Sequence, residues 1–205
     1  MDRRAFLAFL AAAGIAAPLA GARAQNAVPA ATDFIDRLAQ RAIDGLTAKD
    51  IDAADRAKRF RELFTETFDV PVIGRFALGA PWRTASESDR TEYLKAFEDY
   101  IVASYATRFA DYGGEKIRTT GSRKGEDDEV FVSSDFVRAQ GAPVRVVWRV
   151  RPAQGSWRII DVIIEDVSMA ITQRDDFSAT IQRNGGKISA LIDALKSKTV
   201  SAGKS

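Results

Sequence analysis

The stretch Arg158–Phe177, "RIIDVIIEDVSMAITQRDDF", decides how the rest of the sequence is interpreted. Its first half is rich in isoleucine and valine, which favour a β-strand, and a helix is expected to follow. Two carboxylate pairs, Glu165-Asp166 and Asp175-Asp176, stand after the strand and inside the helix. Such pairs either perform acid and base chemistry or simply end a strand and begin a helix. The remaining sequence has to decide between these interpretations.

The first 24 residues have the layout of a secretory export signal. A charged start containing Arg3-Arg4 precedes an apolar run that is too short for a membrane-spanning helix. Residues 22–24 fit a small-x-small cleavage pattern, so we expect one mature domain over residues 25–198, followed by a flexible tail over residues 199–205. The arginine pair also resembles a twin-arginine signal, and both export routes stay open.

Composition excludes several classes of function. The chain has 30 basic and 28 acidic residues, and removal of residues 1–24 leaves 27 of each. This interspersed balance lacks the basic stripe of nucleic-acid-binding domains. The absence of histidine and cysteine excludes disulfides, the commonest zinc ligand and the histidine-based nucleophile systems. We therefore expect no nucleic-acid partner, no metal or other cofactor, and no catalytic residues.

Hydrophobic periodicity places helices on both sides of a block of strands. The strand candidates are separated by short polar or glycine-bearing turns, which favours an antiparallel meander. In the third of them, apolar residues alternate with arginines, so one face of the sheet is buried. This order predicts an α+β domain. The predicted helices span residues 29–46, 53–68, 71–78, 86–109, 168–183 and 188–198, and the predicted strands span residues 115–121, 129–139, 143–151 and 156–165.

Four segments resemble the MlaC or toluene-tolerance family of periplasmic phospholipid-binding proteins. They are "FRELFTETFDVPVIGRFALGAPWR", "FEDYIVASYATRF", "WRIIDVIIEDVSMAITQRDDFSATIQRNGG" and the leading signal. The resemblance covers residues 34–195. It implies N-terminal and C-terminal helices packed on a curved four-stranded antiparallel sheet, an NTF2-like cone that encloses an apolar cavity.

The resemblance also implies a periplasmic, non-enzymatic carrier that binds the acyl chains of a phospholipid. Such a carrier shuttles lipid between the outer and inner membranes and contacts membranes only transiently. Its implied partners are an inner-membrane ABC transporter complex with a periplasmic substrate-receiving subunit, and an outer-membrane lipoprotein and porin complex. Some family members serve hopanoid or other lipid export, so the cargo stays open.

Periodicity identifies the inward-facing residues, but it does not distinguish a cavity wall from a filled core. Each candidate is therefore either a lipid-binding residue or a core residue. The candidates are Phe64, Phe68, Ile73, Phe76, Tyr93, Phe97, Tyr100, Ile101, Tyr105, Val146, Trp148, Val162 and Ile164.

Two arginines are candidates for the lipid headgroup. Arg174 is expected on the apolar side of its helix, where it would bind a phosphate or form an ion pair with Glu165, Asp161 or Asp166. Arg83 would lie either at the cavity mouth or at an exposed helix cap.

Two other classes of function compete with the carrier. In an isomerase or dehydratase built on a similar cone, a buried Asp135 or Asp161 would abstract a proton. In a protein-binding adaptor, the aromatic residues would form an exposed docking patch and enclose no cavity.

Overall fold

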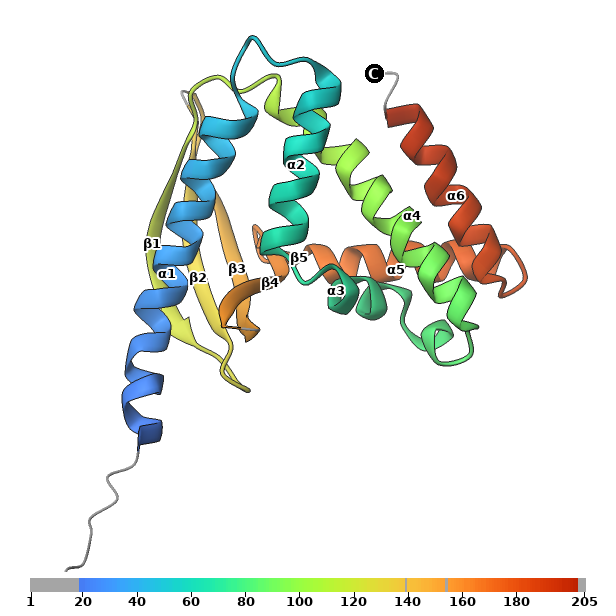
Figure 1. Cartoon of the computed structure of the whole chain (residues 1–205), viewed down its shortest axis with the longest axis horizontal. Coiled ribbons are helices and arrows are strands. Elements are labelled where there is room, and N and C mark those ends of the chain that lie inside the picture. The colour runs from blue at the N-terminus through green and yellow to red at the C-terminus, as the bar shows by residue number, and fades with distance from the viewer. Residues whose placement is uncertain (1–18, 139, 154, 203–205) are drawn as a thin grey trace, which may run out of the picture.

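The structure, a computed structural model, describes residues 19–138, 140–153 and 155–202 (Figure 1). Residues 1–18, most of the predicted export signal, lie outside the described residues, as do residues 203–205 of the predicted tail. The helices are α1 (Leu19–Leu46), α2 (Ala53–Thr67), α3 (Val70–Leu78), α4 (Glu87–Ala106), α5 (Met169–Arg183) and α6 (Ile188–Ala202), with short 3-10 helices η1 (Ala80–Arg83) and η2 (Thr107–Phe109). The strands are β1 (Lys116–Lys124), β2 (Val130–Val137), β3 (Val144–Ala153), β4 (Ser156–Ile164) and β5 (Val167–Ser168).

The strands form one antiparallel sheet in the order β1-β2-β3-β4-β5, so the predicted α+β meander is confirmed. The predicted count of four strands is wrong by one, because the two-residue strand β5 folds back on β4. Glu165 and Asp166 connect them with φ of 47° and 66°. Positive φ at both central residues is what a tight type I′ hairpin turn requires.

The Glu165-Asp166 pair also anchors the neighbouring strand. The Glu165 carboxylate accepts a hydrogen bond from the backbone amide of Arg145 at 2.5 Å, and the Arg145 guanidinium pairs with Asp166. The Glu165-Asp166 pair therefore ends a strand and fixes its edge, which is the structural rather than the catalytic interpretation of this pair.

β4 contains a β-bulge next to a buried aspartate. Arg149 pairs with Asp161, whereas Val150 pairs with Ile159, so Ile160 is the extra residue. A bulge bends its strand and re-aims side chains. Asp161, which follows the extra residue, is buried. One of its carboxylate oxygens accepts a hydrogen bond from the Ser168 hydroxyl at 2.6 Å, and the other accepts one from the Ala170 amide of α5 at 3.0 Å.

Two hydrophobic clusters divide the molecule. The first joins α1 to the inner face of the sheet, the face that carries Val132 and Val150. The second packs α2 to α6 together around Tyr93 and Phe97. Phe68 packs against both clusters. Figure 1 shows the two parts side by side, with the sheet and α1 on the left and α4 and α6 on the right.

The end of α2 is fixed to β4 by what we call the β4 junction. The Asp69 amide donates to the Ile159 carbonyl at 2.9 Å, beside a single parallel bridge between Phe68 and Ile159. The Asp69 carboxylate also pairs with Arg151 at 2.7 Å. These contacts therefore attach the end of α2 to the sheet at a defined position.

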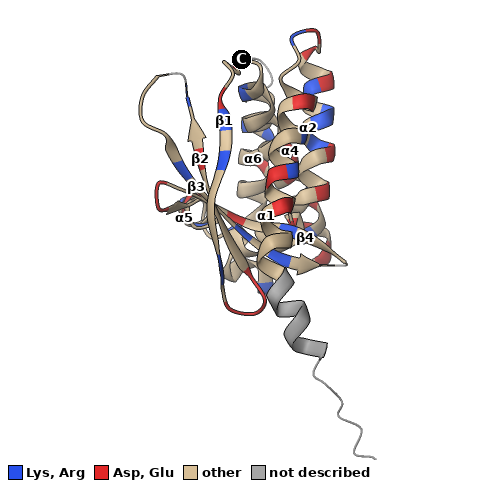
Figure 2. Ribbon diagram, turned by 90° about the vertical axis from the view of Figure 1, so that its left-hand side faces the viewer, with Lys and Arg blue, Asp and Glu red and all other residues tan. Residues whose placement is uncertain are grey.

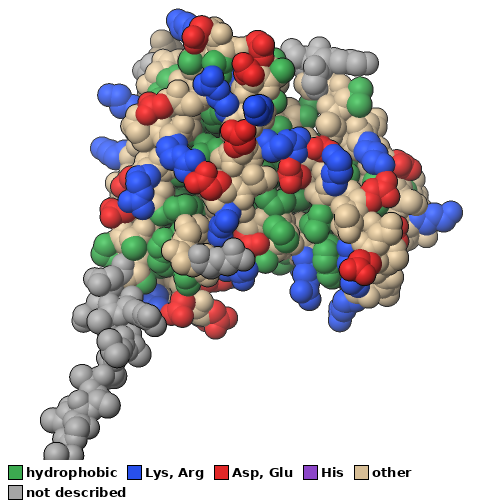
Figure 3. All heavy atoms as spheres, in the orientation of Figure 1, with side chains coloured by type: hydrophobic (Ala, Val, Ile, Leu, Met, Phe, Trp, Pro, Cys, Tyr) green, Lys and Arg blue, Asp and Glu red, His purple; other side chains and the backbone are tan. Residues whose placement is uncertain are grey.

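The outer face of the sheet is polar, as the alternation in β3 predicts. Figure 2 is turned toward the sheet and shows basic and acidic residues interspersed along it. Arg149 pairs with Glu129 at 2.7 Å and Arg118 with Asp135 at 3.1 Å. Figure 3 shows the same mixture of charges over another face of the molecule.

Both chain ends are more helical than predicted. α1 begins at Leu19 instead of Pro29 and runs across the predicted cleavage position, because the alanine-rich stretch before Pro29 favours a helix, although Pro29 inside the helix removes one backbone donor. α6 continues to Ala202, four residues into the predicted tail.

Replacement of Asp161 by alanine should lower the free energy of unfolding by about 1–2 kcal/mol, because α5 loses its capping carboxylate. Asp135→Ala is the matched control, since Asp135 forms a surface pair and its loss should cost less than about 0.5 kcal/mol. Urea unfolding measures both. Equal effects of the two replacements would contradict the capping role.

Tyr93 is fully buried, and its hydroxyl donates to the Gly74 carbonyl at 2.9 Å. Tyr93→Phe should cost about 1 kcal/mol at pH 8. Burial raises the pKa of Tyr93, so its stabilising effect is complete below the ordinary tyrosine pKa of about 10 and is lost as the pH rises above it. The stability difference between wild type and variant should therefore shrink between pH 8 and 11. A difference that grows over this range would contradict the assignment.

Candidate functional site

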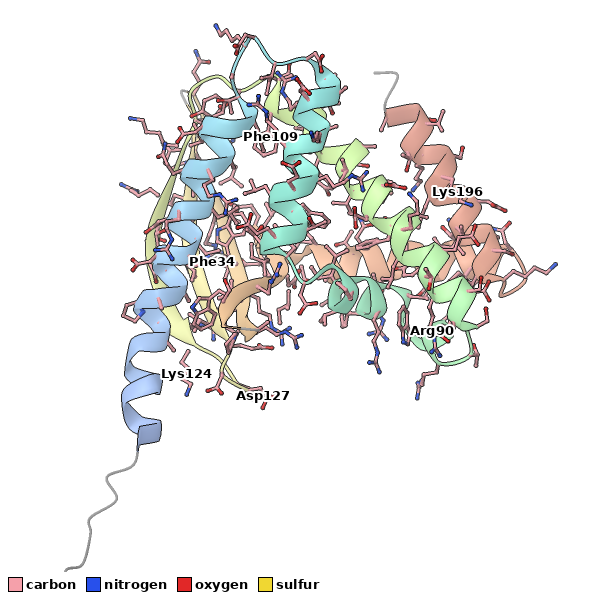
Figure 4. All side chains as sticks on the ribbon, in the orientation of Figure 1. Phe34, Arg90, Phe109, Lys124, Asp127 and Lys196 are labelled. Atoms are coloured by element: carbon pink, nitrogen blue, oxygen red, sulfur yellow. The ribbon has the colours of Figure 1, made fainter. Side chains whose placement is uncertain are left out.

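A cavity of about 590 Å³ lies between the inner face of the sheet and the helices α1 to α5. Its volume falls within the range of small-molecule binding pockets. Most of its wall is aliphatic or aromatic. The lining includes Leu38 and Ile43 of α1, Phe60 of α2 and Phe109 of η2. Figure 4 labels Phe109, near the upper ends of α1 and α2. This arrangement suits a long apolar ligand.

Ten of the thirteen predicted lipid-binding residues line this cavity. They come from the helices α2, α3 and α4, from the residue that follows α2, and from the strands β3 and β4, so no short motif could reveal the site. These residues are Phe64, Phe68, Ile73, Phe97, Ile101, Tyr105, Val146, Trp148, Val162 and Ile164.

The other three predicted residues lie elsewhere. Tyr93 is in the helical core, between Phe97 and Phe177. Tyr100 is half-buried, with the Lys198 amine 5.7 Å from its ring centroid. Phe76 is 41% exposed on α3. α4 is covered by α6 along one side, so its aromatic stripe is divided between that contact and the cavity.

Neither predicted headgroup arginine lines the cavity. Arg174 is exposed, and its guanidinium lies 5.2 Å from the ring centroid of Phe76. The predicted pairing of Arg174 with Glu165, Asp161 or Asp166 is wrong, because no described ion pair includes it and Asp161 caps α5. Arg83 is exposed in η1, and its carbonyl accepts from Arg90.

Sequence reasoning missed two parts of the wall. The first is α1, which was predicted as a helix without a functional role and contributes Ile35, Leu38 and Ile43. Its apolar periodicity was a usable signal. The second is a charged group formed by Arg108 and Arg138 together with Asp111 and Glu115. No periodic pattern marks these residues, because they lie in η2 and in the connections of the sheet.

The interior of the cavity contains few polar groups. The Trp148 indole donates to the Ser134 hydroxyl at 3.3 Å, which satisfies two polar side chains within the apolar wall. Asp161 is also a lining residue, but both of its carboxylate oxygens accept hydrogen bonds at the start of α5. Asp135 lies on the outer face, paired with Arg118. The proposed proton abstraction therefore has no support from either aspartate.

Other site types find no support in the described part of the chain. Its residues include no cluster of three or more acidic, histidine or cysteine side chains suited to a metal ion. Among its helices, none combines the length and apolarity needed to cross a membrane.

Comparison with known proteins is consistent with this geometry. A protein from Haemophilus influenzae described as the intermembrane phospholipid transport system binding protein MlaC is 26% identical over 105 residues, which is 49% of each chain. Toluene tolerance protein ttg2D of Pseudomonas putida is 20% identical over 120 residues, covering 58% of this chain and 56% of that protein. The matched part spans about half the length of these relatives.

The fold has a solved counterpart. A phospholipid-binding protein from Ralstonia solanacearum, solved in complex with a phospholipid, superimposes with a TM-score of 0.75 at 18% identity. The match covers 84% of this chain and 98% of that one. Likeness at this identity establishes the fold.

The sequence model of the family described as "MlaC protein" matches residues 32–197, which include every cavity-lining residue named above. This match extends over most of the chain and agrees with both relatives and with the solved structure. The chain therefore belongs to the MlaC protein family.

Proposed function

We propose that this protein is a periplasmic, non-enzymatic carrier that holds the acyl chains of a phospholipid in its cavity and shuttles the lipid between the outer and inner membranes. The single observation that carries this proposal is the apolar cavity of about 590 Å³ in a chain of the MlaC family. The phospholipid in the complex of the structurally similar Ralstonia solanacearum protein supports it.

The energetics of lipid transfer explain the need for enclosure. Burial of a methylene group is worth about 0.8 kcal/mol. Exposure of two chains of about fifteen carbons to water therefore costs a free energy on the order of 24 kcal/mol. A carrier that crosses water must cover most of this surface. The required site is a deep apolar cavity with few polar or reactive groups. The observed lining matches this requirement, because it is dominated by side chains such as Phe97, Ile101 and Trp148.

We further propose that residues 1–24 are a cleaved export signal and that residues 25–198 act as one lipid-binding domain. In this view the protein receives lipid at an outer-membrane lipoprotein and porin complex. It then delivers the lipid to the substrate-receiving subunit of an inner-membrane ABC transporter. The names of the two relatives, which refer to intermembrane phospholipid transport and toluene tolerance, support this placement.

Native mass spectrometry of the mature protein tests the carrier function. Protein purified from a membrane-bearing host without detergent should show the chain mass plus that of one or more phospholipids, which extraction then identifies. A mass equal to the chain alone, with nothing gained after incubation with phospholipid vesicles, would contradict the proposal.

Filling the cavity should reduce its occupancy. Val146 points from β3 into the cavity, whereas its neighbour Val147 is half-buried outside the lining. Val146→Trp should lower the bound lipid per protein at least about threefold while changing stability by less than about 2 kcal/mol, because the indole enters empty space. Val147→Trp is the matched control and should retain wild-type occupancy. Unfolding of the Val146 variant would instead mark this position as packed core.

A further inference from the structure

Charged residues mark the mouth of the cavity. Among the described residues that line it, three are exposed to solvent, namely Arg108, Asp111 and Arg138. Glu115 is half-buried and adds a second carboxylate to the same lining. We call these four residues the mouth group. The mouth group contains two positive and two negative charges, so its formal charge sums to zero.

The backbone brings two members of the mouth group, Glu115 and Arg138, to one end of the sheet. Asp111 and Glu115 lie in the connection between η2 and β1, and Arg138 directly follows β2. Lys116 pairs with Val137 in the antiparallel register, so the next position outward places Glu115 opposite Arg138.

The connection that carries the carboxylates is internally bonded. The Gly113 amide donates to the Glu115 carboxylate at 2.8 Å, and the Tyr112 hydroxyl donates to the Glu115 carbonyl at 2.6 Å. Gly114 has a φ of +95°, which permits the sharp reversal before β1. The turn therefore presents Glu115 in a defined position at the mouth.

The charges of the mouth group form no ion pairs with one another. Of the ion pairs within the described ranges, none includes any of its four residues. The Arg108 guanidinium lies 5.0 Å from the ring centroid of Tyr105, and Arg138 donates to the Ala142 carbonyl at 3.4 Å. Both guanidinium groups therefore keep donors that face no carboxylate.

We propose, resting on the carrier function above, that the mouth group selects a zwitterionic aminophospholipid. Arg108 and Arg138 bind the phosphate, for which a planar guanidinium fork is suited. Asp111 and Glu115 accept the primary ammonium. An anionic headgroup would gain the first contact but leave both carboxylates unpaired beside its own negative charge, which disfavours it.

The test is competition between two lipids with identical acyl chains. The mature protein is freed of lipid and incubated with vesicles of equal phosphatidylethanolamine and phosphatidylglycerol content, and the lipid bound to the protein is quantified by mass spectrometry. Wild type should bind phosphatidylethanolamine with about fivefold preference, because several exposed charge contacts differ between the lipids. Glycerophosphoethanolamine, which lacks the tails, should not compete at the same concentration.

Two double variants separate the roles. Asp111→Asn with Glu115→Gln keeps hydrogen-bonding groups but removes the negative charge, so the bound ratio should fall to that of the vesicles. Arg108→Gln with Arg138→Gln should lower uptake of both phospholipids about fivefold. Arg118→Gln, on the outer face of the sheet, is the control and should keep the wild-type ratio. Circular dichroism verifies that each variant is folded.

The possible failures are distinguishable. A wild-type ratio equal to that of the vesicles, or a carboxylate variant that keeps the preference, overturns this inference and leaves the carrier function intact. Competition by the tail-free headgroup shows instead that the site binds the free phosphodiester and overturns the assignment to a lipid. Wild-type protein that binds neither lipid contradicts the carrier function and this inference together.

Discussion

The β4 junction is the contact on which the cavity depends. Asp69 joins the end of α2 to β4 through its amide, which bonds to Ile159, and through its carboxylate, which pairs with Arg151. Asp161 fixes the start of α5 to the same strand by capping it. α1 covers Val132 and Val150 on the inner face of the sheet, while Ser134 of β2 and Val146 of β3 lie in the cavity wall.

The helical wall is stabilised from outside the cavity. Arg61 of α2 pairs with Asp99 of α4 at 2.7 Å, and Arg41 of α1 binds Glu66 of α2 through both guanidinium nitrogens. This Arg41 contact lowers the pKa of the Glu66 carboxyl. An empty apolar cavity deprives its lining of packing contacts, whereas a bound ligand stabilises the folded state by mass action. The ion pairs outside the cavity and a ligand bound inside it would therefore both stabilise the folded helical wall.

Sequence periodicity predicted the order and type of the elements but not the boundary between core and cavity. Tyr93 and Tyr105 belong to the same aromatic stripe of α4, yet Tyr93 is packed in the helical core and Tyr105 lines the cavity. The difference depends on which other helices cover each turn of α4, and the local sequence of α4 does not contain this information. Asp161 caps α5 beside the extra residue Ile160, and the strand pattern reveals neither the cap nor the bulge.

The central claim is that the space between the sheet and the helices holds acyl chains. A crystal structure of the mature protein, purified without removal of lipid, tests this claim most directly. The account predicts continuous density for acyl chains against Val146, Trp148 and Phe97, with the polar end of the lipid near Arg108 and Arg138. A cavity closed by inward movement of α2 onto the sheet, with no density between them, would contradict it.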